Sequence, residues 1–118
     1  GSLKLEKALL ARWQQTPLRV RQMRVPSRVL LSNKISNTHS VIEVNGRDFP
    51  GLLHKITLCL ASLGLQIQTA TVSTYGERVV DVFYVKDIFG LQIQSETRRQ
   101  TIRSRLLAVF DDADEEAV

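Results

Sequence analysis

The segment from Val41 to Leu53, VIEVNGRDFPGLL, holds the residues whose types and spacing are best suited to binding chemistry. A β-branched run leads through Gly46, Asp48 and Gly51 into an apolar helix pattern, so a strand is expected to pass directly into a helix. Free amides at a helix N-terminus can bind a carboxylate, and an aspartate beside them can pair with an ammonium group. The spacing therefore favours a site for a small polar ligand.

A purely structural interpretation of this loop stays open. Asp48 can cap the helix with its side chain, and Phe49-Pro50 can then form the first turn, where proline is tolerated. Gly46 would in that case be only a turn residue. Spacing alone does not separate this interpretation from ligand binding.

The remaining reactive side chains do not form a catalytic set. His39, His54 and Cys59 lack the spacing of metal ligands. Cys59 lies between two leucines and is expected to be a buried structural thiol, while His54 is expected on the surface or near the loop. No Walker loop, dinucleotide glycine fingerprint, serine elbow or zinc helix is present. The chain by itself is therefore predicted not to be an enzyme.

From residue 27 onward the hydrophobic patterns predict the order β, β, α, β, β, α. In the third strand the apolar residues change from odd to even positions, which predicts a β-bulge near Gln68 or Thr69. The predicted elements are strands at 27–33, 39–45, 65–74 and 78–86, a helix from about 49 to 63, and a helix from 95 to 110 with Ile102, Leu106, Val109 and Phe110 on its core face.

This order predicts an α+β ferredoxin-like sandwich, in which two helices cover one face of a four-stranded antiparallel sheet. The usual form is βαββαβ, but no strand follows the last helix here. We expect the strand at 27–33 to arrive early, by a hairpin, at the edge that the missing strand would fill. The fold would then be a circularly permuted version, with an extra N-terminal helix.

The strand at 78–86 is apolar on both faces, although a sheet covered on one side should alternate apolar and polar residues. We interpret this pattern as a surface that pairs with another domain. A modestly apolar outer face, or contact with the N-terminal helix, is the alternative. The two faces are Val80, Val82 and Tyr84 on one side, and Val79, Phe83 and Val85 on the other, with Asp81 as the polar exception.

Composition sets the wider limits. The chain has 118 residues, enough for one domain, and its one cysteine excludes an intrachain disulfide. It contains neither an apolar run long enough to span a membrane nor a signal-peptide pattern, so a reducing cytoplasmic setting and no membrane partner are expected.

The net charge of +4 suggests a nucleic-acid partner only until it is divided along the chain. Residues 1–36 hold 8 basic side chains against 1 acidic one, whereas residues 37–118 hold 8 against 11. The strand at 78–86 also carries Asp81 where an RNA-recognition sheet would stack a base. We therefore expect no nucleic-acid binding.

Four segments follow from these patterns. Residues 1–2, Gly-Ser, are interpreted as a cloning remnant. Residues 3–26 are predicted to form an amphipathic helix and a basic linker, and residues 27–110 the folded domain. Residues 111–118, DDADEEAV, are predicted to be an acidic disordered tail.

Two stretches, VIEVNGRDFPGLLHKIT and LGLQIQTATVSTYGERVVDVFYVKD, together resemble the ACT domain, a regulatory module that binds amino acids. The resemblance covers residues 26–110. The run YGERVVDVFYVKD, followed by a terminal helix, is similar to the last ACT domain of the bifunctional uridylyltransferase/uridylyl-removing enzymes of bacterial nitrogen regulation. Phe49 departs from the pattern, in which a polar or basic residue precedes Pro-Gly.

This resemblance implies that the domain senses L-glutamine, bound between its own 45–53 loop and the second core strand of a neighbouring ACT domain. Backbone groups of residues 49–53 would take the α-carboxylate or α-amino group, Asp48 would hold the ligand or cap the helix, and residues 66–68 would meet the side-chain amide. The ligand-binding residues so implied are Asn45, Gly46, Arg47, Asp48, Phe49, Gly51, Leu52, Leu53, Gln66, Ile67 and Gln68.

The resemblance also implies a larger parent enzyme that modifies the PII signal protein, with UTP as substrate and Mg²⁺ or a similar divalent metal as cofactor. No cofactor is expected in this fragment. A neighbouring ACT domain is the expected partner in the parent, and a homodimer could replace it in the isolated chain. The alternative function is a ligand-independent module that docks on the catalytic domains or on PII.

Overall fold

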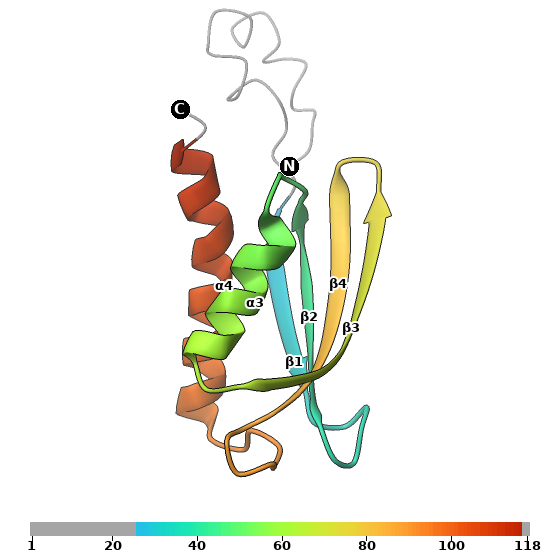
Figure 1. Cartoon of the computed structure of the whole chain (residues 1–118), viewed down its shortest axis with the longest axis vertical. Helices are drawn as coiled ribbons and strands as arrows, with labels where there is room; N and C mark the ends of the chain where they lie inside the picture. Colours follow the sequence, from blue (N-terminus) through green and yellow to red (C-terminus); the bar gives the residue numbers. More distant parts are fainter. Residues whose placement is uncertain (1–25, 117–118) are drawn as a thin grey trace, which may run out of the picture.

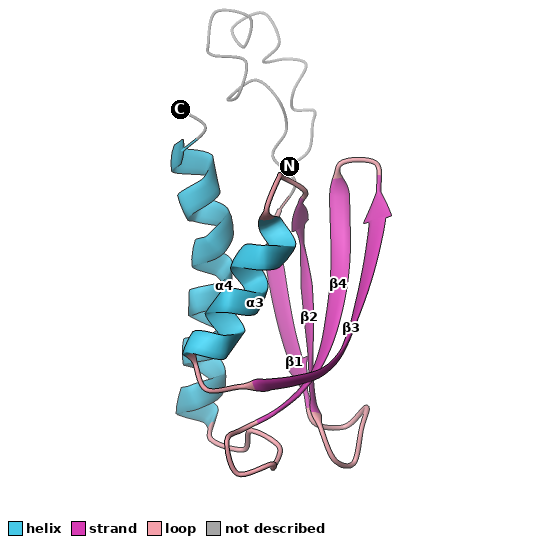
Figure 2. Ribbon diagram, in the orientation of Figure 1, coloured by secondary structure: helices cyan, strands magenta, loops and turns pink. Residues whose placement is uncertain are grey.

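Two helices lie side by side on one face of a four-stranded antiparallel sheet (Figures 1 and 2). The computed structural model describes residues 26–116, and the side chains of residues 26–111. The elements are β1 (Arg28–Ser32), β2 (Ser40–Arg47), α3 (Leu52–Ser62), β3 (Gln66–Tyr75), β4 (Arg78–Lys86) and α4 (Glu96–Glu116). The predicted ferredoxin-like ACT sandwich is confirmed. The predicted helix and linker before residue 26 lie outside the described residues.

The sheet order is β1-β2-β4-β3, so the permutation is also confirmed. β1 pairs with β2 at the edge of the sheet, from Arg28 opposite Asn45 to Ser32 opposite Val41. In β3 the pairing with β4 shifts register between Ile67 and Thr69, which places the predicted bulge at Gln68. The change of apolar phase in the sequence is therefore a true insertion into the strand.

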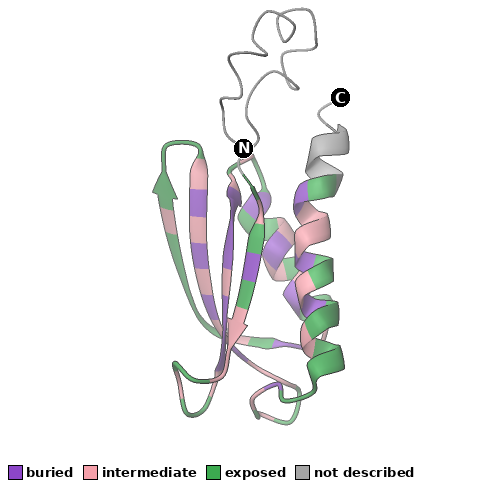
Figure 3. Ribbon diagram, turned by 180° about the vertical axis from the view of Figure 1, so that it is seen from behind, coloured by how far each residue is buried: buried purple, intermediate pink, exposed green. Residues whose placement is uncertain are grey.

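The core lies between the helices and the two central strands. Alternate residues of β2 and β4 face the helices and are buried (Figure 3). Of the predicted face of α4, three residues are buried and Val109 is half-buried at the margin of the core. The residues with no exposed surface in this core are Ile42, Val44, Ile56, Leu60, Phe83, Val85, Ile102 and Leu106.

Helix α3 begins at Leu52, later than predicted, and Asp48 does not cap it. The N-cap is Gly51, whose φ of 83° is left-handed, and the helix start has no side-chain cap. Pro50 disfavours a helical conformation for the residue before it, and the Asp48 N–H donates to the Glu77 carbonyl oxygen at 2.8 Å. The chain therefore turns at residues 50–51 before the helix begins.

The last helix continues beyond its predicted end. α4 runs to Glu116, so residues 111–116 are helical and do not belong to the predicted tail. Once a helix has formed, each added residue gains one hydrogen bond for one residue ordered, so the helix can continue past the last buried side chain, Phe110. Residues 117–118 lie outside the described part.

A hydrogen-bond network joins the β1–β2 loop to the segment before α4. The two N–H groups of the Gln92 side-chain amide are shared among the carbonyl oxygens of Asn33 (3.2 Å), Ser36 (2.8 Å) and His39 (3.0 Å). The Ser40 hydroxyl donates to Asn33 Oδ1 at 2.6 Å and accepts from the Ile93 N–H at 2.9 Å. The Gln92 side chain thus anchors the loop between β1 and β2.

Gln92→Ala is expected to lower the free energy of unfolding by about 1 kcal/mol, because part-buried carbonyl groups lose their donor. Urea denaturation measures this change. The matched control is Gln100→Ala, which alters an exposed glutamine of α4. Equal losses in the two variants would contradict the structural importance of Gln92.

Candidate functional site

The candidate site is the loop between β2 and α3, where the helix starts without a side-chain cap. In the first turn the Leu52 N–H donates to the Phe49 carbonyl oxygen (3.1 Å) and the Lys55 N–H to that of Gly51 (3.0 Å). Within residues 26–116, no acceptor takes the N–H of Leu53 or His54. These two amides lie at the positive end of the helix dipole and suit an anionic ligand group.

Phe49 closes the loop against the second helix. Its ring meets the Phe110 ring edge-to-face, with centroids 6.2 Å apart and planes at 88°. The Lys55 ammonium lies 5.8 Å from the centroid of the Phe49 ring. The departure from the family pattern at this position therefore has a packing reason.

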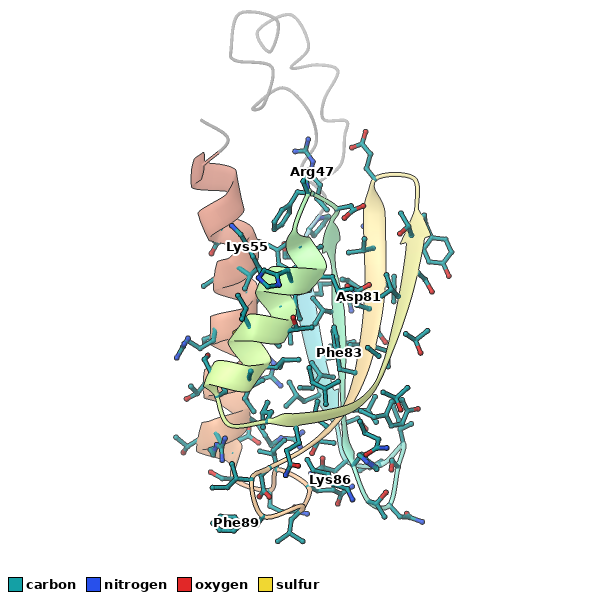
Figure 4. All side chains as sticks on the ribbon, viewed as in Figure 1. Arg47, Lys55, Asp81, Phe83, Lys86 and Phe89 are labelled. Atoms are coloured by element: carbon teal, nitrogen blue, oxygen red, sulfur yellow. The ribbon has the colours of Figure 1, made fainter. Side chains whose placement is uncertain are left out.

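Three other predicted site residues belong to β2 and do not lie at the helix start. Gly46 lies within β2, buried beneath the Phe110 ring. Asn45 is on the outer face of the sheet and donates to Glu43 Oε2 at 2.7 Å. Arg47 ends the strand on that same face, at the loop end of the sheet (Figure 4).

Residues 66–68 lie at the other end of the sheet. Gln66 pairs with Lys86, whereas Tyr75, at the far end of the same strand, pairs with Arg78 beside Arg47. Nine strand steps separate the two ends, or about 30 Å. The Gln66 side chain donates to the Asp87 carbonyl oxygen at 2.8 Å. One ligand cannot contact both groups of predicted residues within a single chain.

Of the predicted set, the structure therefore leaves Asp48, Phe49, Gly51 and Leu53 around the helix start. Asp48 and Leu53 are exposed there, whereas Leu52 is buried in the core. A surface hollow of about 350 Å³ lies at the opposite end and contains none of the predicted site residues. It is lined by Asn37, Thr38, Lys86, Gly90, Leu91, Gln92 and Gln94.

Asp81 was not among the ligand-binding residues predicted from the sequence. It lies on the helix-facing side of β4, is only 1% exposed, and its Oδ1 has no hydrogen-bond partner. Burial, and then the nearby carboxylate of Asp48, raise the pKa of Asp81. The signal was visible in the sequence, because Asp81 is the polar residue on an otherwise apolar face.

The other reactive side chains do not assemble. Cys59 is half-buried, and burial raises the pKa of its thiol, partly offset by the positive charge of Arg105. His54 is exposed, and His39 contacts the Thr38 hydroxyl through Nδ1 at 2.8 Å. The described residues contain no group of His, Cys, Asp and Glu that could hold a metal ion. The divalent metal implied for the parent enzyme therefore does not fit this part of the chain.

Membrane insertion receives no support from the helices. Neither helix between residues 26 and 116 combines the length and apolar character that crossing a bilayer requires.

The sequence is similar to curated bifunctional uridylyltransferase/uridylyl-removing enzymes. The protein of Rhodospirillum rubrum is 51% identical over 110 residues, which is 93% of this chain. That of Azospirillum brasilense is 51% identical over 95% of the chain, and that of Gluconobacter oxydans 46% over 96%. The chain spans 12% of the length of each of these relatives.

No protein-family model matches the sequence. No solved structure matches it. The assignment thus depends on the curated relatives, whose identity extends over nearly the whole chain. In sequence, the chain corresponds to one fragment of the bifunctional uridylyltransferase/uridylyl-removing enzymes.

Proposed function

We propose that this chain is a regulatory ACT domain that binds L-glutamine and controls an enzyme that adds and removes uridylyl groups on the PII protein. The observation that carries the proposal is the start of α3, where a left-handed glycine, Gly51, leaves the first-turn amides without a side-chain cap. Those amides suit the α-carboxylate of an amino acid. The names of the relatives support the uridylyl chemistry of the whole enzyme.

The site would be completed by a second ACT domain. β3 is one of the two edge strands of the sheet, and several large apolar side chains on β3 and α3 are exposed. They are Leu53 (42%), Leu58 (55%), Val72 (48%) and Tyr75 (65%). Exposed apolar side chains beside an open strand edge suit a protein partner.

An antiparallel arrangement of two such domains reconciles the separated groups of predicted residues. If two β3 edges pair by a two-fold axis, the start of one strand lies beside the end of the other. Residues 66–68 of one domain then approach the 48–53 loop of its neighbour. The side-chain amide of glutamine would meet Gln66 and Gln68 from the neighbouring domain.

Isothermal titration calorimetry tests this function. The 118-residue chain is expected to bind L-glutamine about tenfold or more tightly than L-glutamate or L-asparagine, because an amide site leaves polar groups unpaired with the wrong side chain. Light scattering on the same sample checks that the chain is dimeric. A folded dimer that shows no preference for glutamine would exclude the proposal.

A ligand-independent docking module is the second candidate, and one observation favours it. The loops at the far end expose large apolar side chains, including Phe89 at 78% (Figure 4). The others are Ile35 (65%), Ile88 (63%) and Leu91 (62%). Capture of the catalytic domains or PII that is unaffected by glutamine would support this role. For either role we propose the cytoplasm as the compartment.

A further inference from the structure

Asp81 lies where the covered part of the sheet meets its uncovered edge. In the ladder it stands between Val44 of β2 and Val72 of β3. Val44 has no exposed surface, whereas Val72, on the same helix-facing side, is 48% exposed. Figure 4 shows Asp81 between α3 and β4. The side chain is therefore buried, but its neighbour toward β3 is open to solvent.

The flank of α3 that faces β3 is the one that carries Leu53. Lys55 and Cys59 lie on the flank near α4, because they contact Phe49 and respond to Arg105, respectively. Leu53 projects from the other flank, about 160° around the helix from Lys55. It is 42% exposed. Leu53 on this flank of α3 and Val72 of β3 are thus exposed on the side of the sheet next to Asp81.

The environment of Asp81 favours a positive ligand group. Its Oδ1 is buried without a hydrogen-bond partner, and the charge that acts on it is another carboxylate, that of Asp48. A buried carboxylate without a partner is unfavourable, and an incoming cationic donor would relieve that cost. The same loop offers two free amides at the start of α3 for an anionic group.

From this geometry we infer that Asp81, together with Asp48, receives the α-ammonium group of an amino acid whose α-carboxylate lies on the amides of Leu53 and His54. The inference rests on the proposed function and adds to it the charge partner of the ligand. Because the ammonium group of every free amino acid is the same, Asp81 would set affinity for the class. Preference for glutamine would come from the neighbouring domain.

A pair of ligands and a pair of variants test this role. The ligands are L-glutamine and 4-carbamoylbutanoate, which is glutamine without its α-amino group. The variants of the full chain are Asp81→Asn, which keeps the shape of the side chain, and Glu96→Gln, which removes one exposed carboxylate at the far end of α4. Calorimetry at pH 7.5 measures the affinity of each variant, and of the unchanged chain, for each of the two ligands.

Asp81→Asn is expected to weaken glutamine binding about tenfold or more, the usual size for a charge-assisted hydrogen bond. It should leave the weak binding of 4-carbamoylbutanoate unchanged, and Glu96→Gln should alter neither. Unchanged glutamine affinity in Asp81→Asn, or an equal loss for both ligands, overturns the inference while leaving the proposed function intact. Absence of glutamine binding by the unchanged chain overturns both.

A spectroscopic measurement shows whether Asp81 contacts the ligand or only stabilises the site. Carbon-13 NMR of the aspartate side chains follows the protonation of Asp81 with pH, and the asparagine variant assigns its signal. Saturating glutamine is expected to lower the pKa of Asp81, because a bound ammonium group favours the carboxylate. An unchanged pKa in the presence of bound glutamine would show that Asp81 does not meet the ligand.

Discussion

Gly46→Ala is expected to lower the free energy of unfolding by about 2–3 kcal/mol, as overpacking of a close-packed core does. A Cβ atom at Gly46 would collide with the Phe110 ring, coming within 2.7 Å of its Cζ and within 3.0 Å of its Cδ1. Phe110 is 4% exposed and also packs edge-to-face against Phe49, so the ring has little room to move. Urea denaturation should show a lower midpoint with an unchanged m-value.

The control for this prediction is the double variant Gly46→Ala with Phe110→Leu. The leucine lacks the ring atoms that the new methyl group would meet. In this background the added cost of Gly46→Ala should fall below about 1 kcal/mol, which makes the two changes coupled. An equal cost in both backgrounds would mean that the ring does not cause the destabilisation.

Gly46 also shows that a local sequence pattern does not reveal contacts with residues distant in the chain. From the sequence it is a turn glycine in a ligand loop, because the residues that follow it read as the entry to a helix. Its real neighbour is Phe110, which lies on α4 far along the chain. The prediction that Asp48 caps the helix was wrong for a similar reason. Asp48 was available to cap, but its backbone is taken up by Glu77 of the β3–β4 turn.

Features that depend on local periodicity were predicted well. The bulge at Gln68 followed from a change of apolar phase in one strand, and the early edge strand followed from the absence of a strand after the last helix. For the site, the strand-to-helix passage through Asp48 and Gly51 was predicted, but the helix begins at Leu52 and Asp48 does not cap it. Within one chain the length of β3 separates residues 66–68 from the 48–53 loop. Only a second domain could bring these two groups of residues together at one ligand.

Asp81→Asn is expected to raise the free energy of unfolding by about 1–3 kcal/mol at pH 7.5, since it replaces a buried carboxylate that lacks a partner for Oδ1. Burial, and then the charge of Asp48, raise the pKa of Asp81 in the folded chain. In the unfolded chain an aspartate titrates near about 3.9. Between these two pKa values the folded chain binds more protons than the unfolded chain, so the stability contribution of Asp81 falls as pH rises through that window.

The asparagine variant lacks this contribution, so the stability difference between the two proteins should be largest above the folded pKa of Asp81. It should shrink as pH falls through the folded pKa of Asp81, because the side chain becomes protonated in the folded chain. Urea denaturation across this range measures the difference, with Glu96→Gln as the control for an exposed carboxylate. Parallel profiles would contradict the prediction. A gain in stability together with the loss of ammonium recognition would identify Asp81 as a carboxylate kept for binding, whereas a loss of stability would make it part of the core.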